Sequence, residues 1–121
     1  MSSVGALAWC PFPDVATAER AADALLAEGL IACANILPAM RSRYVWQGRH
    51  ETATEAGVLF KTHAELLAKL VERIPALHPH EEPAILGWAC DQAGPGTARW
   101  LGELFAPSAL PGPADSKGDA S

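Results

Sequence analysis

The segment Ile31–Lys61, IACANILPAMRSRYVWQGRHETATEAGVLFK, decides the fold. Its first part, up to Trp46, favours a strand that is interrupted at Pro38, because proline cannot donate a ladder hydrogen bond and is confined to strand edges and bulges. Gly48 falls in the turn WQGRH, and Glu51–Lys61 returns as a second strand in which every other side chain shares one face. The segment therefore predicts a long β-hairpin.

A strand and a helix are expected before this hairpin. Val4–Cys10 is a short apolar run, which predicts a buried strand closed by the breaker cluster PFPD. Asp14 is a suitable N-cap for the helix that follows, and Gly29 is a suitable residue to end it. Apolar residues between them recur at helical spacing, so this helix is expected to be amphipathic.

A second helix, a strand and a last helix are expected after the hairpin. Thr62 and Glu65 in THAE have the spacing of a capping box, which predicts a helix that Pro75 and Pro79 prevent from continuing far. Ala84–Cys90 is apolar, as a central strand buried on both faces would be, and apolar spacing predicts a short helix over Thr97–Phe105.

The element order is thus strand, helix, strand, strand, helix, strand, helix. Strand-helix-strand crossovers are right-handed, which puts both long helices on one face of an antiparallel four-stranded sheet. This α+β arrangement is the ferredoxin-like split βαβ (βαββαβ plus a C-terminal helix). We expect one domain over residues 1–106 and a flexible tail over residues 107–121, whose sequence has too little apolar area to offset the entropy of ordering it.

Charge and composition exclude several classes of function. The formal net charge is −5 and the nine Lys and Arg are scattered, which disfavours nucleic acid as a partner. No apolar run approaches the about 20 residues that span a bilayer, and no basic region precedes the first apolar run, so we expect a protein without a membrane partner in the cytoplasm. Phosphate-loop, dinucleotide and nucleophile motifs are missing, which argues against an enzyme.

The segment HPHEEP is a candidate metal site. Pro79 biases His78 towards an extended conformation, in which His78 and His80 can point to the same side. Imidazole with a carboxylate from Glu81 or Glu82 suits copper, nickel or zinc. The alternative is a polar loop between prolines, with a histidine near a helix C-terminus, that binds no ligand.

Two further groups of residues have more than one interpretation. Cys10, Cys33 and Cys90 are far apart and odd in number, which fits small core residues better than a disulfide framework or a zinc site. Tyr44 and Trp46 share one strand face, and their area exceeds what one small sheet covers, which indicates an interface. An ordinary core face is the alternative for these aromatic residues.

Short motifs spread along the chain resemble those of the CutA family, named for divalent-cation tolerance, over about residues 4 to 105. They are CANILP, then Ser42, Tyr44, Trp46, Gly48, Glu55, Lys61 and Thr62, and finally His78, Pro79, Glu81 and Pro83. The resemblance implies a ferredoxin-like trimer whose hairpins pair across subunits, a cytoplasmic location in bacteria, binding of divalent cations with copper foremost, and no established enzyme activity. It also implies that Cys10 and His78 are candidate metal ligands.

The chain departs from the family pattern at three positions. HPHEEPA stands where the family has HPYExPE, so His80 replaces an aromatic residue and Ala84 replaces a carboxylate. Thr97 stands where the family has a tyrosine, three residues before Trp100. The resemblance places the lost tyrosine and carboxylate in a cleft between subunits, so this cleft is expected to be altered, whereas the added histidine favours a metal site.

The sequence thus predicts a homotrimer that binds a divalent transition metal, most readily copper. The expected metal ligands are His78, His80, Cys10 and Glu81. The residues expected at the subunit interface or its cleft are Ser42, Tyr44, Trp46, Glu55, Lys61 and Trp100. Two alternatives stay open: a small-molecule sensor resembling the PII signalling proteins, and a structural trimer that anchors a partner.

Overall fold

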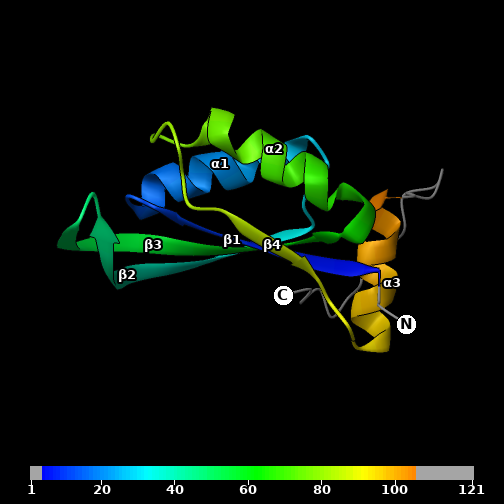
Figure 1. The fold of residues 1–121 in the computed structure, drawn as a ribbon. Helices are drawn as coiled ribbons and strands as arrows, with labels where there is room; N and C mark the ends of the chain where they lie inside the picture. The colour runs from blue at the N-terminus through cyan, green and yellow to red at the C-terminus, as the bar shows by residue number, and fades with distance from the viewer. Residues whose placement is uncertain (1–3, 106–121) are drawn as a thin grey trace.

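The computed structural model describes residues 4–105, and the predicted tail over residues 107–121 lies outside this range. The elements are β1 (Gly5–Phe12), α1 (Val15–Ala27), β2 (Cys33–Trp46), β3 (Arg49–His63), the 3-10 helix η1 (Ala64–Leu66), α2 (Leu67–Leu77), β4 (Leu86–Ala89) and α3 (Pro95–Phe105). The strands form one antiparallel sheet in the order β2-β3-β1-β4, and α1 and α2 cover the same face (Figure 1). The predicted ferredoxin-like split βαβ fold is confirmed.

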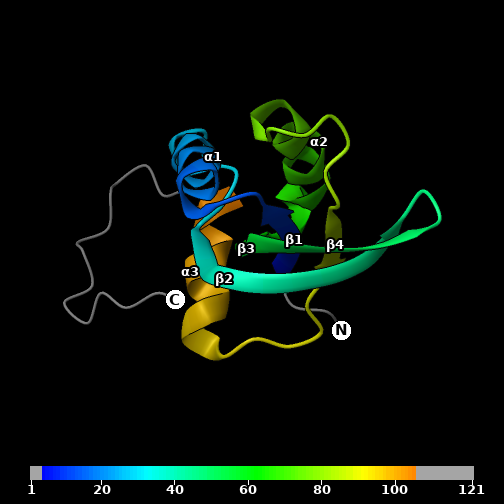
Figure 2. The same cartoon turned by 90° about the vertical axis from the view of Figure 1, so that its left-hand side faces the viewer.

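The hairpin of β2 and β3 is long and strongly curled (Figure 2). Its register shifts between Leu37 and Met40, where Ala39 has a φ of 55°, so the predicted irregularity at Pro38 is confirmed as a bulge. The two-residue turn at its tip has positive φ at Gln47 and Gly48, as a turn that matches the strand twist requires. The far end of the hairpin projects beyond the two helices.

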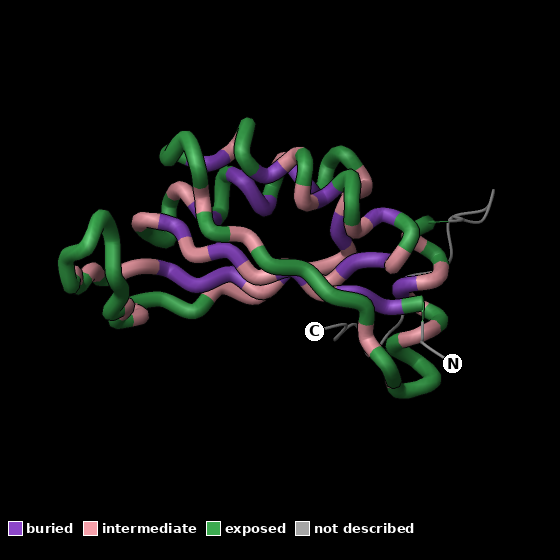
Figure 3. Tube along the Cα trace, in the orientation of Figure 1, coloured by how far each residue is buried: buried purple, intermediate pink, exposed green. Residues whose placement is uncertain are grey.

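The core lies between α1, α2 and the face of the sheet towards them (Figure 3). Alternate residues of the two central strands supply that face, among them Ala6, Ala8, Cys10 and Phe12 of β1 and Ala56, Val58 and Phe60 of β3. The predicted buried first strand is thus confirmed, and it runs two residues further, through Pro11. Proline is tolerated there because β4 pairs with β1 only as far as Trp9.

The first helix begins and ends as predicted. Asp14 Oδ1 accepts a hydrogen bond of 2.8 Å from the backbone N–H of Thr17, and Gly29 follows the helix with a φ of 73°.

The predicted start of the second helix is wrong. Thr62 belongs to β3 and is buried, while His63 is the N-cap of η1, its Nδ1 accepting from the N–H of Glu65 at 2.9 Å.

The predicted end of the second helix is confirmed, whereas the prediction for the last strand is wrong. Pro75 lies inside α2, which ends two residues later, at Leu77, so the helix does not continue far beyond it. The last strand was expected to be central and buried on both faces, but β4 is an exposed edge strand of four residues (Figure 3). An apolar run does not reveal its position in the sheet, and here the apolar side chains of Leu86 and Trp88 remain 69% and 45% exposed.

The predicted last helix is confirmed as α3. It lies at one end of the sheet, mainly on the side away from α1 and α2 (Figures 1 and 2). Leu101 is buried, Trp100 is half-buried, and Phe105 stacks on His63 with ring centroids 4.8 Å apart. None of the helices within residues 4–105 is long and apolar enough to cross a membrane.

The buried hydroxyl of Thr62 joins β3 to the chain before β2, because it donates a hydrogen bond of 2.8 Å to the carbonyl of Leu30. We expect Thr62→Val to lower the free energy of unfolding by about 1–3 kcal/mol, since it leaves that carbonyl unsatisfied without creating a cavity. Thr54→Val, on the same strand face but exposed, should change it by less than about 0.5 kcal/mol. Equal effects of the two substitutions in urea unfolding would contradict this role of Thr62.

Candidate functional site

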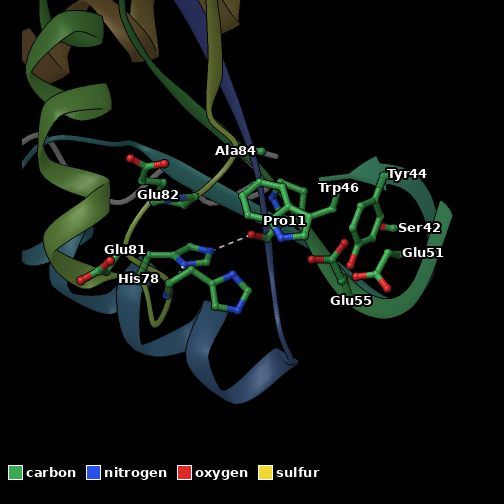
Figure 4. Close-up of a pocket in the computed structure, with 12 residues that line it drawn as sticks. Pro11, Ser42, Tyr44, Trp46, Glu51, Glu55, His78, Glu81, Glu82 and Ala84 are labelled. Carbon is green, nitrogen blue, oxygen red and sulfur yellow. Dashed lines mark hydrogen bonds between the residues drawn. The ribbon is translucent and has the colours of Figure 1, made fainter. Parts of the chain in front are cut away.

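A pocket of about 640 Å³ lies between the projecting end of the hairpin and the loop that joins α2 to β4 (Figure 4). It is lined by Pro11, Ser42, Tyr44, Trp46, Glu51, Glu55, His78, His80, Glu81, Glu82, Pro83 and Ala84. A volume of this size lies in the range of small-molecule sites, which is about 300–1,000 Å³. Most of the residues singled out in the sequence therefore meet in one cavity.

The hairpin wall follows from strand alternation. Ser42, Tyr44 and Trp46 are two residues apart on β2, so their side chains share the face that lines the pocket. Across the ladder Tyr44 pairs with Glu51, which brings a carboxylate beside the phenol ring. Glu55 lies four residues after Glu51 on the same face of β3, and it also lines the pocket. Tyr44 and Trp46 are 43% and 53% exposed, so the core-face alternative does not hold for them in a single protomer.

The loop wall is anchored by His78. Its Nε2 lies 2.8 Å from the carbonyl of Pro11, and its Nδ1 accepts a hydrogen bond of 3.0 Å from the N–H of His80. Both bonds require the neutral tautomer that carries its proton on Nε2. The ring also packs on Phe12 with centroids 4.4 Å apart, and only 8% of the residue is exposed. His78 therefore holds the loop against the end of β1.

The environment of His78 favours its neutral form. Burial lowers the pKa of the ring, the nearby His80 adds to this, and the bond to Pro11 opposes it in part. Protonation would also place an N–H on Nδ1, facing the N–H of His80. Both ring nitrogens are thus occupied in the folded protomer.

His80, Glu81 and Glu82 form the exposed rim of the loop. The rings of His78 and His80 lie side by side with centroids 5.1 Å apart, so these histidines do come together as the spacing predicted. His80, unlike His78, is exposed, and it is among the residues that line the pocket. It is the more accessible nitrogen donor.

Cys10 stands apart from the pocket residues. It is fully buried in the core, and burial, with a smaller effect of Glu55, raises the pKa of its thiol to about 12. Metals bind the thiolate, which this environment disfavours. The expectation that all three cysteines are small core residues holds for Cys10 alone, because Cys33 and Cys90 are only half-buried.

The predicted ligands do not form a complete metal site within one protomer. Residues 4–105 contain no group of three or more His, Cys, Asp or Glu side chains placed to hold a metal ion. His78, His80 and Glu81 line the pocket and Cys10 does not. The donors present are of the types that transition metals accept, but one chain presents too few of them together.

The predicted cleft residues divide into two groups. Ser42, Tyr44, Trp46 and Glu55 line the pocket. Lys61 and Trp100 do not, since Lys61 lies at the opposite end of β3 and Trp100 lies on α3. The sequence analysis missed Pro11 and Glu51. The hairpin register would have revealed Glu51 opposite Tyr44, whereas no local signal indicates that Pro11 meets the loop.

Residues 6–104 match the family model described as CutA1 divalent ion tolerance protein. The chain belongs to this family. A divalent-cation tolerance protein CutA from Pyrococcus horikoshii is 40% identical over 95 residues, which cover 78% of this chain and 92% of that protein. The CutA resemblance inferred from short motifs is therefore confirmed.

Solved structures of CutA proteins share the fold. A CutA from Xylella fastidiosa has a TM-score of 0.80 at 32% identity, covering 84% of this chain and 98% of that chain. A protein from Archaeoglobus fulgidus, titled periplasmic divalent cation tolerance protein CutA, has a TM-score of 0.77 at 30% identity, covering 83% of this chain and 97% of that chain. Family membership therefore rests on both sequence and structure.

The anchoring of His78 predicts a loss of stability in acid. The folded protein resists protonating this ring, whereas the unfolded chain binds the proton near pH 6.5, so the stabilisation is complete above that pH and declines as the pH falls below it. We expect the melting temperature to drop less between pH 7 and pH 5 in His78→Gln than in the unmodified protein. The exposed His50 supplies the control His50→Gln, which should keep the original pH dependence. Identical slopes for all three proteins would contradict the assignment.

Proposed function

We propose that this protein is a homotrimer that takes part in the response to divalent cations by binding a transition metal ion, copper in preference to others, without enzymatic activity. The observation that supports this most directly is the pair of adjacent imidazoles on the pocket wall in a chain of the divalent ion tolerance family. We expect copper because, in the usual order of divalent transition metals, Cu²⁺ has the highest affinity for nitrogen and oxygen donors. The CutA resemblance further supports a cytoplasmic location.

His80 is the principal nitrogen donor in this proposal, and Glu81 contributes an oxygen. His78 joins them only by giving up its bond with the N–H of His80, because that bond uses the lone pair of Nδ1. The bound metal would supply a centre of positive charge within the carboxylate-lined pocket. Residues of a second copy complete the ligand set, since one protomer brings too few donors together.

The exposed edges of the sheet support the trimer. Among residues 4–105, the edge strands β2 and β4 are each bonded to one neighbouring strand only, and they carry exposed apolar side chains, including Val45 and Trp46 on β2 and Leu86 and Trp88 on β4. When one edge of a subunit meets the other edge of a neighbouring subunit, the interface is head-to-tail. Repetition of this interface closes into a ring when the rotation from one subunit to the next permits it. Three is the number of subunits that the CutA resemblance implies.

Small-molecule sensing is a second candidate function, and the size of the pocket favours it. A cavity of about 640 Å³ exceeds what a single ion needs, since one water occupies about 30 Å³ of liquid. A purely structural trimer would have no need of such a pocket.

Light scattering at micromolar concentration tests the assembly, and the expected mass is three times that of the 12.7 kDa chain. Trp46→Ala should lower the stability of the trimer by about 3 kcal/mol or more, because the part of the large ring that does not face the pocket is buried between subunits in this arrangement. Leu26→Ala, exposed on α1 on the helix side of the sheet, is the control and should change it little. A monomeric mass, or equal melting curves for the two variants, would refute the trimer.

Calorimetric titration with Cu²⁺ tests the metal site. We expect His80→Ala to weaken copper binding about tenfold or more, and binding to weaken in acid because imidazole must be neutral to coordinate. Cys10→Ser should leave copper affinity unchanged, since the thiol is buried outside the pocket. His50→Ala controls for histidine outside the loop. Unchanged affinity and stoichiometry in a His78→Ala, His80→Ala double variant would show that these histidines only shape a polar loop.

A further inference from the structure

We propose that the pocket is also a binding site for a small organic cation, an aliphatic diamine or a longer polyamine, and that this ligand binds without a metal. The inference starts from the composition of the cavity rather than from its histidines. It goes beyond metal binding and does not depend on it.

The charge of the pocket selects for cations. Four of its lining residues are glutamates, namely Glu51, Glu55, Glu81 and Glu82, whereas no lysine or arginine is among the described residues that line it. Carboxylates that line the same cavity focus a negative potential and raise the local concentration of positive ligands. Phosphates, carboxylic acids and nucleotides are disfavoured by the same field.

The aromatic wall selects an organic cation over a metal ion. Tyr44 and Trp46 present half-exposed rings to the cavity, and the faces of tyrosine and tryptophan attract ammonium groups. Glu55 and Glu51 project from the hairpin next to these rings (Figure 4). An alkylammonium group can therefore contact both an aromatic face and a carboxylate, a combination that a hydrated metal ion does not exploit.

The two walls of the pocket favour a ligand with a charge at each end. Glu51 and Glu55 belong to β3, whereas Glu81 and Glu82 belong to the loop between α2 and β4. The apolar side chains of Pro11, Pro83 and Ala84 lie along the same cavity and suit a chain of methylene groups. A diamine can place one ammonium group at the carboxylates of β3 and the other at those of the loop, whereas a monoamine can reach only one wall at a time.

Calorimetry on the full chain after treatment with EDTA provides the test. The probe is 1,4-diaminobutane, compared with 1,4-butanediol, which has the same shape without charge, and with Mg²⁺, which has charge without an apolar body. We expect saturable binding of the diamine, no binding of the diol, and binding of Mg²⁺ at least about tenfold weaker, because only the diamine uses both the carboxylates and the rings. No diamine binding, or equal affinity for Mg²⁺, would overturn the inference.

Two variants test the residues, and a third is the control. Glu55→Gln keeps the shape and removes one charge, and Trp46→Leu removes a ring; each should weaken diamine binding about tenfold. Glu19→Gln, exposed on α1 and outside the pocket, should leave it unchanged. If Trp46→Leu does not assemble, Glu55→Gln decides alone, and unchanged diamine affinity in Glu55→Gln refutes the proposed site.

The copper titration separates this inference from the proposed metal function. A protein that binds copper but not diaminobutane refutes the organic cation and leaves the metal site standing. A protein that binds diaminobutane but not copper supports the organic cation and refutes the metal site.

Discussion

The alternation of side chains along β3 is the constraint on which both the core and the pocket depend. Ala56, Val58 and Phe60 point towards α1 and α2 and are almost completely buried. Glu51 and Glu55 occupy the opposite set of positions and reach the pocket. Because the period of a strand is two, a slip of one residue would move the carboxylates into the core and the apolar residues into the cavity. Burial of the core therefore also fixes the register of the functional wall.

Periodicity made most of the fold predictable from sequence, and the failures have a common cause. The hairpin, the bulge near Pro38 and the cap at Asp14 are local features, because neighbouring residues determine them. The position of β4 at the sheet edge is not local, and an apolar run alone cannot distinguish an edge from a centre. The error at Thr62 is of the same kind, since its hydroxyl is used by Leu30, which is distant in sequence.

In the candidate site, too, the local features could be predicted from the sequence and a long-range contact could not. The shared face of Ser42, Tyr44 and Trp46 could be predicted from strand spacing, as could the approach of His78 to His80. The contact of His78 with the carbonyl of Pro11 could not, because it joins the loop to the end of β1 across 67 residues. This contact changes the meaning of the HPHEEP motif. Of its two histidines, one secures the loop and the other is left available for a ligand.

Within residues 4–105, the pocket and the open edge of the sheet arise from the same feature, the projection of the hairpin beyond the helices. One face of this projection carries Tyr44 and Trp46 into the cavity, and β2 forms the open edge of the sheet beside it. In the proposed trimer, a neighbour that pairs with β2 therefore packs next to the cavity and restricts its exposure to water. Exclusion of water strengthens interactions between carboxylates and cations. Assembly and ligand binding then stabilise one another, because a ligand that favours the assembled form shifts the equilibrium towards it.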